Sequence, residues 1–245
     1  MIHGAGGATQ SWRGLFPILA QKFHVVAVDL PGQGFTQAGS STRFGLDETA
    51  ADLLELIGAL KVTPSLVVGH SAGVPIAMRL VEKGLDPKWG VVGINAALAN
   101  FKGVAGWLFP ILAKTLATTP LSAALFTATA TPSSIANLIK GTGSELDAVG
   151  QDLYLQLARD KTHVQSTLTM MAQWSLDDLL ERLPGYSGRL ILAVGERDQA
   201  VPPATSVRVS RIIRHSQLIN LKGLGHLAHE EDPKTFAKLI SDAAI

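Results

Sequence analysis

The chain has 245 residues, enough for one large domain, or a domain with an insertion, to bury a substantial core. Its 21 basic and 20 acidic residues nearly balance and form no basic cluster of the kind that nucleic-acid binding needs, so we exclude that class of partner. The lack of cysteine excludes disulfides and thiolate metal sites and fits a cytoplasmic protein, and no motif indicates a cofactor or a metal ion.

A loop of small residues, His3-Gly4-Ala5-Gly6-Gly7, lies close to the first residue of the chain. Such a loop is expected to follow a complete hydrophobic strand, yet only Met1 and Ile2 precede it. We therefore expect that N-terminal strands are missing, either because the sequence starts late or because it is a truncated product.

The rest of the chain alternates between short, buried-type strands and helices, which is typical of a mainly parallel sheet flanked by helices. Asp47 is the predicted cap of the second helix, and Ser144 is the predicted cap of a helix in the middle of the chain. The expected helices cover residues 11–21, 47–60, 74–82, 145–159, 204–213 and 233–243. The expected strands cover residues 23–28, 66–68, 91–95, 190–194 and 217–221.

The alternation stops after the strand at 91–95, where the composition shifts to Ala, Thr, Leu, Phe and Trp. Lys114 is the only charged residue between positions 103 and 139, which raises the question of a membrane span. We reject a span because prolines and many Ser, Thr and Asn residues interrupt the apolar run. The segment instead predicts a helical cap with an apolar inner face. The predicted domains are a core of residues 1–96 and 180–245 and a cap of residues 97–179.

The sequence Gly69-His70-Ser71-Ala72-Gly73 stands where a β-branched strand meets a helix-compatible segment. This G-x-S-x-G pattern indicates a nucleophile elbow, in which the two glycines let strand and helix pack closely while Ser71 projects from the sheet edge. Pro75 falls in the first turn of the helix, where a missing N–H costs little. The alternative is an ordinary strand-to-helix turn that holds a glycine-flanked serine.

A serine hydroxyl becomes a good nucleophile only when a base takes its proton, and histidine can supply that base. Of the seven histidines, His226 and His229 follow the last strand, at the edge where parallel sheets place their active sites. We prefer His226 because a glycine-rich loop can aim its ring. His229 and the acids that follow it are more typical of the start of the last helix.

The imidazole in turn needs an acid that holds its tautomer and stabilises its charged form. Asp198 lies just beyond the strand at 190–194, and the resulting order of serine, aspartate and histidine matches hydrolases with this elbow. Glu196 and Asp29 are competitors, although Glu196 is better placed to support its loop and Asp29 could brace the His-Gly loop. The other common position for the acid, after the strand that contains Asn95, is empty, because no Asp or Glu occurs there before Glu145.

Acyl transfer also needs hydrogen-bond donors for the oxyanion of the tetrahedral intermediate, and loss of one donor typically costs ~100- to 1000-fold in rate. One predicted donor is the backbone N–H of Ala72, the residue after the nucleophile. The second is expected from the His-Gly loop, and Ala5 is the preferred residue. Small side chains in that loop let its backbone approach the substrate.

With these features in place, nearly the whole chain resembles the α/β-hydrolase superfamily. A narrower resemblance, to the magnesium-chelatase accessory hydrolases of bacteriochlorophyll synthesis, implies an association with the insertion of magnesium into protoporphyrin IX. In that family the strand before the His-Gly loop lies centrally in the sheet, between the strands of Val25 and Val67. The segments that carry the narrower resemblance are GINAAL at 93–98, GTGS at 141–144, MMAQW at 170–174 and GLGHLAHE at 223–230.

Three functions are consistent with these features. The leading hypothesis is a serine hydrolase that cleaves an ester or related acyl bond of an apolar substrate under the cap, and its tetrapyrrole context comes from the resemblance alone. The second is a non-catalytic porphyrin-binding or chelatase accessory protein that retains the hydrolase fold. The third is a protein that docks on a membrane surface through Trp107-Leu108-Phe109 of the cap. We favour the enzyme, because a pure binding protein does not need Ser71, Asp198 and His226 together.

Overall fold

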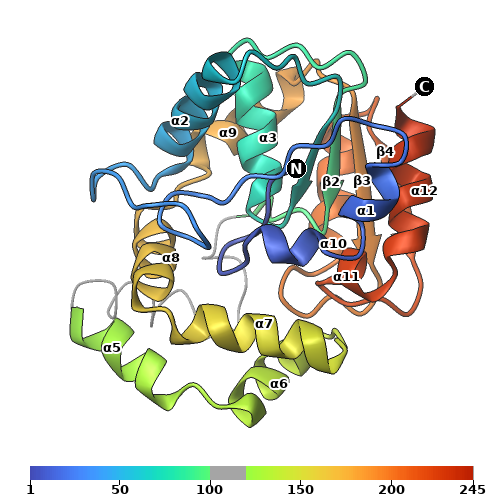
Figure 1. The fold of residues 1–245 in the computed structure, drawn as a ribbon. Coiled ribbons are helices and arrows are strands. Elements are labelled where there is room, and N and C mark those ends of the chain that lie inside the picture. Colours follow the sequence, from blue (N-terminus) through green and yellow to red (C-terminus); the bar gives the residue numbers. More distant parts are fainter. Residues whose placement is uncertain (100–119, 245) are drawn as a thin grey trace.

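The computed structural model describes residues 1–99 and 120–244. Four parallel strands form a sheet in the order β1-β2-β3-β4, so each strand pairs with the next one along the chain (Figure 1). The predicted α/β fold with a parallel sheet is thereby confirmed. The strands are β1 (Val67–His70), β2 (Val91–Ile94), β3 (Leu190–Gly195) and β4 (Gln217–Leu221).

Ile2 extends this sheet beyond β1. It forms parallel bridges to Gly69 on one side and to Val28 on the other, and its N–H and carbonyl both bond to β1 with N···O distances of 2.8 and 2.9 Å. Ile2 thus occupies the central position expected for the strand before the His-Gly loop. The strand predicted at 23–28 is wrong apart from the bridge at Val28, although Met1 also bonds to this segment, donating to Val26 O at 2.7 Å and accepting from Val28 N at 3.2 Å.

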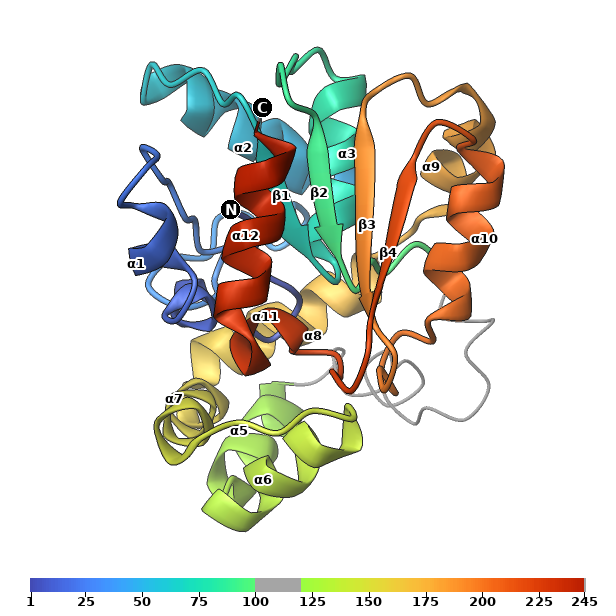
Figure 2. The same cartoon turned by 90° about the vertical axis from the view of Figure 1, so that its right-hand side faces the viewer.

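Two layers of helices cover the sheet (Figures 1 and 2). On one face lie α2 (Leu46–Ala59), α3 (Gly73–Glu82), α9 (Asp177–Arg182) and α10 (Ala204–Ile212). On the other face lie α1 (Phe16–Leu19), α11 (Ala228–Glu231) and α12 (Pro233–Ala243). Two short 3₁₀ helices of the described residues also pack beside the sheet, η1 (Thr9–Trp12) and η3 (Leu183–Gly185).

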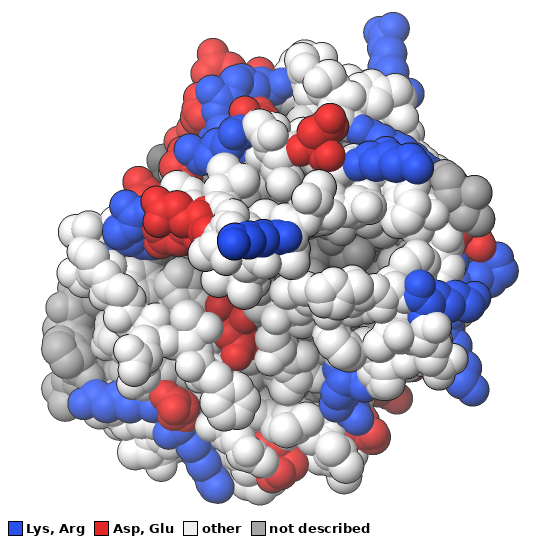
Figure 3. All heavy atoms as spheres, turned by 45° about the horizontal axis from the view of Figure 1, so that its top comes forward, with Lys and Arg blue, Asp and Glu red and all other residues white. Residues whose placement is uncertain are grey.

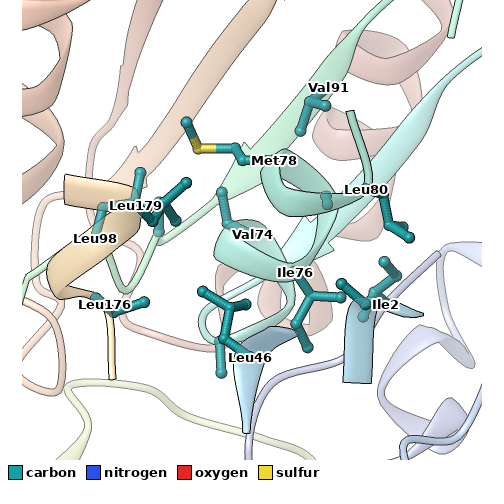
Figure 4. Packing of buried hydrophobic residues seen from close by; sticks show 14 of the residues in the cluster. Ile2, Leu46, Val74, Ile76, Met78, Leu80, Val91, Leu98, Leu176 and Leu179 are labelled. Atoms are coloured by element: carbon teal, nitrogen blue, oxygen red, sulfur yellow. The ribbon is translucent and has the colours of Figure 1, made fainter. Parts of the chain in front are cut away.

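The strands bury side chains on both faces, as expected for a parallel sheet between helix layers. Val67 and Leu192 point into the core shared with α2, α3 and α9, whereas Val68 and Ala193 point into the core shared with α12. Figure 4 shows the first core, where Val74 and other α3 side chains lie among residues from several elements. This packing fixes α3, and with it the turn that precedes α3.

Among the described residues, four helices come between β2 and α9 and interrupt the alternation of strands and helices. They lie beyond the carboxyl ends of the strands (Figures 1 and 2), and we call them the inserted helices. The segment Trp107-Leu108-Phe109, which was the predicted membrane contact, lies outside the described residues. None of the helices within 1–99 and 120–244 has the length and apolar character that crossing a membrane requires. The inserted helices are α5 (Pro120–Thr129), α6 (Pro132–Gly141), α7 (Ala148–Arg159) and α8 (Lys161–Gln173).

The helix predicted at 11–21 is divided into η1 and α1. Gly14 lies in the turn between them, and Pro17 lies in the first turn of α1. Glycine weakens a helix interior, and proline cannot donate the N–H that a continuous helix would need there. The apolar spacing of Trp12, Leu15 and Leu19 is still used, because all three are buried against α12.

Both predicted helix caps are wrong. The helix that follows Ser144 begins after Asp147, whose Oδ1 accepts a hydrogen bond from Gly150 N at 2.7 Å, while Ser144 is buried and accepts one from Leu227 N. Asp147 is an equally good capping residue, so the local sequence did not distinguish the two. At the start of α2 the cap is Gly45, and Asp47 lies inside the first turn.

Asp47 takes part in an ion cluster instead of capping its helix. The guanidinium of Arg79 on α3 is almost fully buried and contacts carboxylates of Asp47, Glu82 and Asp178, from α2, α3 and α9. A buried cation surrounded by three acids ties these helices together. Elsewhere on the surface, basic and acidic side chains lie next to each other on the face shown in Figure 3.

The core between the sheet and α12 contains a fully buried histidine. The ring of His229 lies 4.5 Å, between ring centroids, from both Trp12 and His70, and neither of its nitrogens has a hydrogen-bond partner in the described structure. Desolvation, followed by the nearby His226, lowers its pKa from 6.5 to about 3. His229 is therefore neutral in the folded protein near neutral pH.

We expect His229 to make the fold sensitive to acid. Below pH 6.5 the unfolded chain protonates this imidazole and the folded chain does not, so the free energy of unfolding should decrease by about 1.4 kcal/mol per pH unit from this residue alone. Urea unfolding between pH 7 and pH 4 should show a shallower pH dependence for His229→Leu than for the wild type. The exposed His24→Leu is the control and should keep the wild-type slope. Equal slopes for His229→Leu and wild type would contradict this role.

Candidate active site

The turn between β1 and α3 has the geometry of a nucleophile elbow. β1 ends at His70, α3 begins at Gly73, and Ser71 between them has a left-handed φ of 50°. A Cβ on Gly69 would lie 2.5 Å from the carbonyl oxygen of Gly73, and a Cβ on Gly73 would collide with the carbonyl oxygen of Ile2. The two glycines are thus required by backbone contacts on both sides of the serine.

The acid and the base expected from the sequence are hydrogen-bonded to each other. His226 Nδ1 donates to Asp198 Oδ2 at 2.8 Å, and the Asp198 side chain is fully buried. Its other oxygen, Oδ1, accepts hydrogen bonds from the backbone N–H groups of Ala200 and Val201 at 2.9 and 2.8 Å. Because the carboxylate only accepts, Nδ1 carries the proton and Nε2 of His226 is left with its lone pair.

One cavity brings the predicted site residues together. Ser71, His226, Ala5 and Ala72 all line a cavity of about 300 Å³, and Asp198 lies behind the His226 ring. The competing acids are elsewhere: Glu196 is exposed to solvent outside this cavity.

Asp29, the other competing acid, braces the His-Gly loop. Its Oδ1 accepts a hydrogen bond from Thr9 N at 2.6 Å, and its Oδ2 accepts one from Phe35 N at 2.9 Å. His3 is held in the same region, because its Nδ1 donates to Gly4 O at 2.8 Å and its Nε2 accepts from Leu30 N at 3.0 Å. Desolvation lowers the pKa of His3 to about 4, so this ring is a neutral structural element.

The two predicted oxyanion donors have free N–H groups. No acceptor among residues 1–99 and 120–244 takes a hydrogen bond from the amide of Ala5 or Ala72, although both residues line the cavity. The next amide is not free, since Gly6 N donates to Gln33 Oε1 at 3.1 Å. His163 on α8 donates from Nε2 to Gly6 O at 3.3 Å, so both the N–H and the carbonyl group of Gly6 are held. The Ala5–Gly6 peptide is thereby oriented, and the Gly4–Ala5 peptide, which carries the Ala5 N–H, is held through Gly4 O by His3 Nδ1 and Gly7 N.

His70, next to Ser71, supports His226. Its Nε2 donates to the carbonyl oxygen of His226 at 2.9 Å, and the two rings lie 4.8 Å apart. Desolvation and the neighbouring rings of His229 and His226 lower the pKa of His70 well below 6.5. This fully enclosed imidazole is a neutral donor that fixes the backbone carrying His226.

The walls of the cavity are mainly apolar and come from the inserted helices and the loops around the elbow. Tyr154 and Ala158 of α7 line one part, and the Tyr154 hydroxyl donates to Glu230 Oε1 at 2.8 Å. Desolvation raises the pKa of Glu230 to about 8, so a poorly solvated carboxyl group joins α7 to α11. Other apolar lining residues are Ile135, Leu138 and Ile139 of α6 and Val164, Leu168 and Met171 of α8.

The sequence analysis missed three residues that hold this site: Asn95, Gln33 and His163. Asn95 Nδ2 donates to Asp198 Oδ2 at 2.5 Å from the end of β2, a position where hydrolases of this kind can carry the acid itself. A polar amide at the carboxyl end of a buried strand was a signal available in the sequence. No comparable signal marked Gln33 or His163, because their contacts with Gly6 depend on how distant segments pack.

Comparison with known proteins agrees with this geometry. The model of the alpha/beta hydrolase fold family matches residues 1–233. The magnesium-chelatase 30 kDa subunit of Rhodobacter capsulatus is 40% identical over 99% of this chain and 84% of its own length. The 2-hydroxy-6-oxo-2,4-heptadienoate hydrolase of Pseudomonas putida is 23% identical over 99% of this chain and 87% of its own length.

Among solved structures, an esterase from Exiguobacterium antarcticum superposes with a TM-score of 0.80 at 19% identity, covering 100% of this chain and 90% of the esterase. That likeness concerns the fold. The family match confirms the broader resemblance found in the sequence, and the chelatase-subunit relative confirms the narrower one. The chain belongs to the α/β-hydrolase fold family.

Proposed function

We propose that this protein is a cytoplasmic serine hydrolase that transfers an acyl group from an apolar ester, or a related acyl compound, to water. The observation that carries the proposal is the convergence of Ser71, His226 and two free amides on one cavity, with a fully buried carboxylate behind the histidine. No cofactor or metal is needed for this chemistry, and the described residues contain no cluster of three or more His, Asp or Glu suited to a metal ion.

The proposed reaction assigns one role to each group. Nε2 of His226 takes the proton from Ser71 Oγ, which attacks the acyl carbon, and Asp198 stabilises the imidazolium that results. The backbone N–H groups of Ala5 and Ala72 donate to the oxyanion of the tetrahedral intermediate. Protonated His226 then gives its proton to the leaving group, and water hydrolyses the acyl-enzyme by the same steps.

The cavity supports an apolar and uncharged acyl group as the substrate. Its volume of about 300 Å³ lies at the lower end of the range for small-molecule sites, and none of its described lining residues is Lys, Arg, Asp or Glu. Burial of a charged group there would lack a counter-ion and would be costly. We also propose that residues 97–179 form a cap that closes this cavity, since the inserted helices supply much of its wall.

A link to magnesium chelatase is the second part of the proposal. It rests on the 40% identity to a protein described as a magnesium-chelatase 30 kDa subunit. A tetrapyrrole ester or another acyl ester of the pathway is then the substrate class to test. The description of that relative as a subunit also favours a second candidate, a chelatase accessory or porphyrin-binding protein that retains the hydrolase fold without using it for catalysis.

Covalent labelling tests the enzyme proposal. We expect a fluorophosphonate to add one adduct to the wild type, detected by intact mass, because base and oxyanion donors activate Ser71. Ser71→Ala should not be labelled, and Ser133→Ala, at an exposed serine of α6, should be labelled like the wild type. A folded wild-type protein that resists labelling would refute the hydrolase proposal and put the accessory role first.

The size of the cavity can be tested at α7. Ala158 is buried and lines the cavity, so Ala158→Leu should narrow it and lower kcat/KM for long-chain p-nitrophenyl esters by about 10-fold, with little change for the acetate. Ala148→Leu, at an exposed alanine of the same helix, is the matched control and should not alter chain-length preference. An equal effect on all ester lengths would show that this cavity does not hold the acyl chain.

The accessory role predicts a different result. If it is correct, Ser71→Ala should stimulate magnesium insertion by purified chelatase as well as the wild type does. If hydrolysis is the biological activity, the same variant should lose that stimulation, because its fold is intact and only the nucleophile is gone. The measurement is the rate of magnesium protoporphyrin formation with each variant added.

A further inference from the structure

We propose that Asn95 is a positioning residue that holds Asp198 in line with His226, an inference that rests on the proposed hydrolase function. Asn95 follows β2 and is fully buried. Its Nδ2 donates to Asp198 Oδ2 at 2.5 Å and to Gly225 O at 3.3 Å. One amide group thus touches both the loop that carries the acid and the residue before the base.

The contact completes the set of donors around the carboxylate. Oδ2 of Asp198 accepts from Asn95 and from His226 Nδ1, while Oδ1 accepts two backbone N–H groups. The two backbone bonds hold only one oxygen. The Asn95 bond holds the other, so it fixes the rotation of the carboxylate and keeps Oδ2 in the direction of the imidazole. Hydrogen bonds to an ionised acceptor are among the strong ones.

The same turn also contacts the nucleophile. Ser71 N donates to Ile94 O at 2.9 Å, and Ala97 N donates to Ser71 O at 3.2 Å. Residues on both sides of Asn95 are therefore bonded to the backbone of the serine. The turn after β2 is the place where the segments that carry Ser71, Asp198 and His226 meet.

The alternative is that Asn95 serves only the backbone. Its φ is 48°, in the left-handed region that asparagine tolerates better than most residues. Glycine would satisfy that conformation equally well. Asparagine instead buries an Oδ1 that has no hydrogen-bond partner in the described structure, which is a cost that glycine would avoid. The side chain therefore has a role that its backbone conformation does not explain, and the contact with Asp198 is that role.

Two variants, Asn95→Gly and Asn95→Asp, separate these interpretations, because glycine and aspartate both tolerate the left-handed conformation. Asn95→Gly removes the donor and should lower the rate of fluorophosphonate labelling, and kcat for a p-nitrophenyl ester, by about 10- to 100-fold with KM unchanged, as expected for loss of a hydrogen bond to a charged group. Asn220→Gly, at an exposed asparagine of β4, is the control for the substitution itself and should leave both rates unchanged.

Asn95→Asp gives a pH signature that a structural role would not give. The new carboxyl group can donate to Asp198 only while it is protonated, and once ionised it repels Asp198. The ratio of the labelling rate of Asn95→Asp to that of the wild type should therefore fall as the pH rises from 5 to 8. The ratio for Asn95→Gly should stay constant over the same range.

Wild-type rates for both variants, at all pH values and with wild-type folding, would overturn the proposal. A failure of the hydrolase function itself would look different, because the wild type would then not be labelled. In that case the low-field proton resonance of His226 Nδ1–H, observed by NMR, tests the positioning role directly. It should be present in the wild type and shifted or lost in Asn95→Gly, and an unchanged resonance would overturn the inference.

Discussion

The close approach of α3 to the end of β1 is the constraint on which the rest of the structure depends. Backbone from Ile2 and from the first turn of α3 fills the space that side chains at Gly69 and Gly73 would need. Ser71 is consequently held in a left-handed conformation between two parallel neighbours, Ile2 and β2, that both bond to this part of the chain. The strain of that conformation is offset by the packing of α3 in the core, so the direction of the serine is set by elements far from its side chain.

Burial also decides which histidines stay neutral in the folded protein. Desolvation lowers the pKa of His3, His70, His163 and His229, and three of these rings form hydrogen bonds as neutral donors or acceptors. They orient the loop before η1 and the loop that carries His226. Neutral imidazole serves this purpose well because it offers one donor and one acceptor in a rigid plane. His3, His70 and His163 thus support the candidate site, whereas the ring of His226 combines a buried carboxylate partner with access to the cavity.

Local sequence predicted those features that depend on short-range sterics or on the order of strands. The elbow glycines, the positions of β3, β4 and α12, and the meeting of Asp198 with His226 belong to this group. Features that depend on competition between similar residues were predicted less well, as Ser144 and Asp147 show, since either can cap a helix. Contacts between distant segments left no local pattern. Gln33 and His163 meet at Gly6 only after α8 has packed over the His-Gly loop, and no spacing in the sequence indicates that contact.

That contact couples the inserted helices to the core. His163 belongs to α8, accepts a hydrogen bond from Gly34 N at 3.1 Å through Nδ1 and donates to Gly6 O through Nε2. Its ring also lines the cavity, so one side chain belongs to the wall and joins two loops of the core. A shift of α8 would therefore move the cavity wall and the His-Gly loop together.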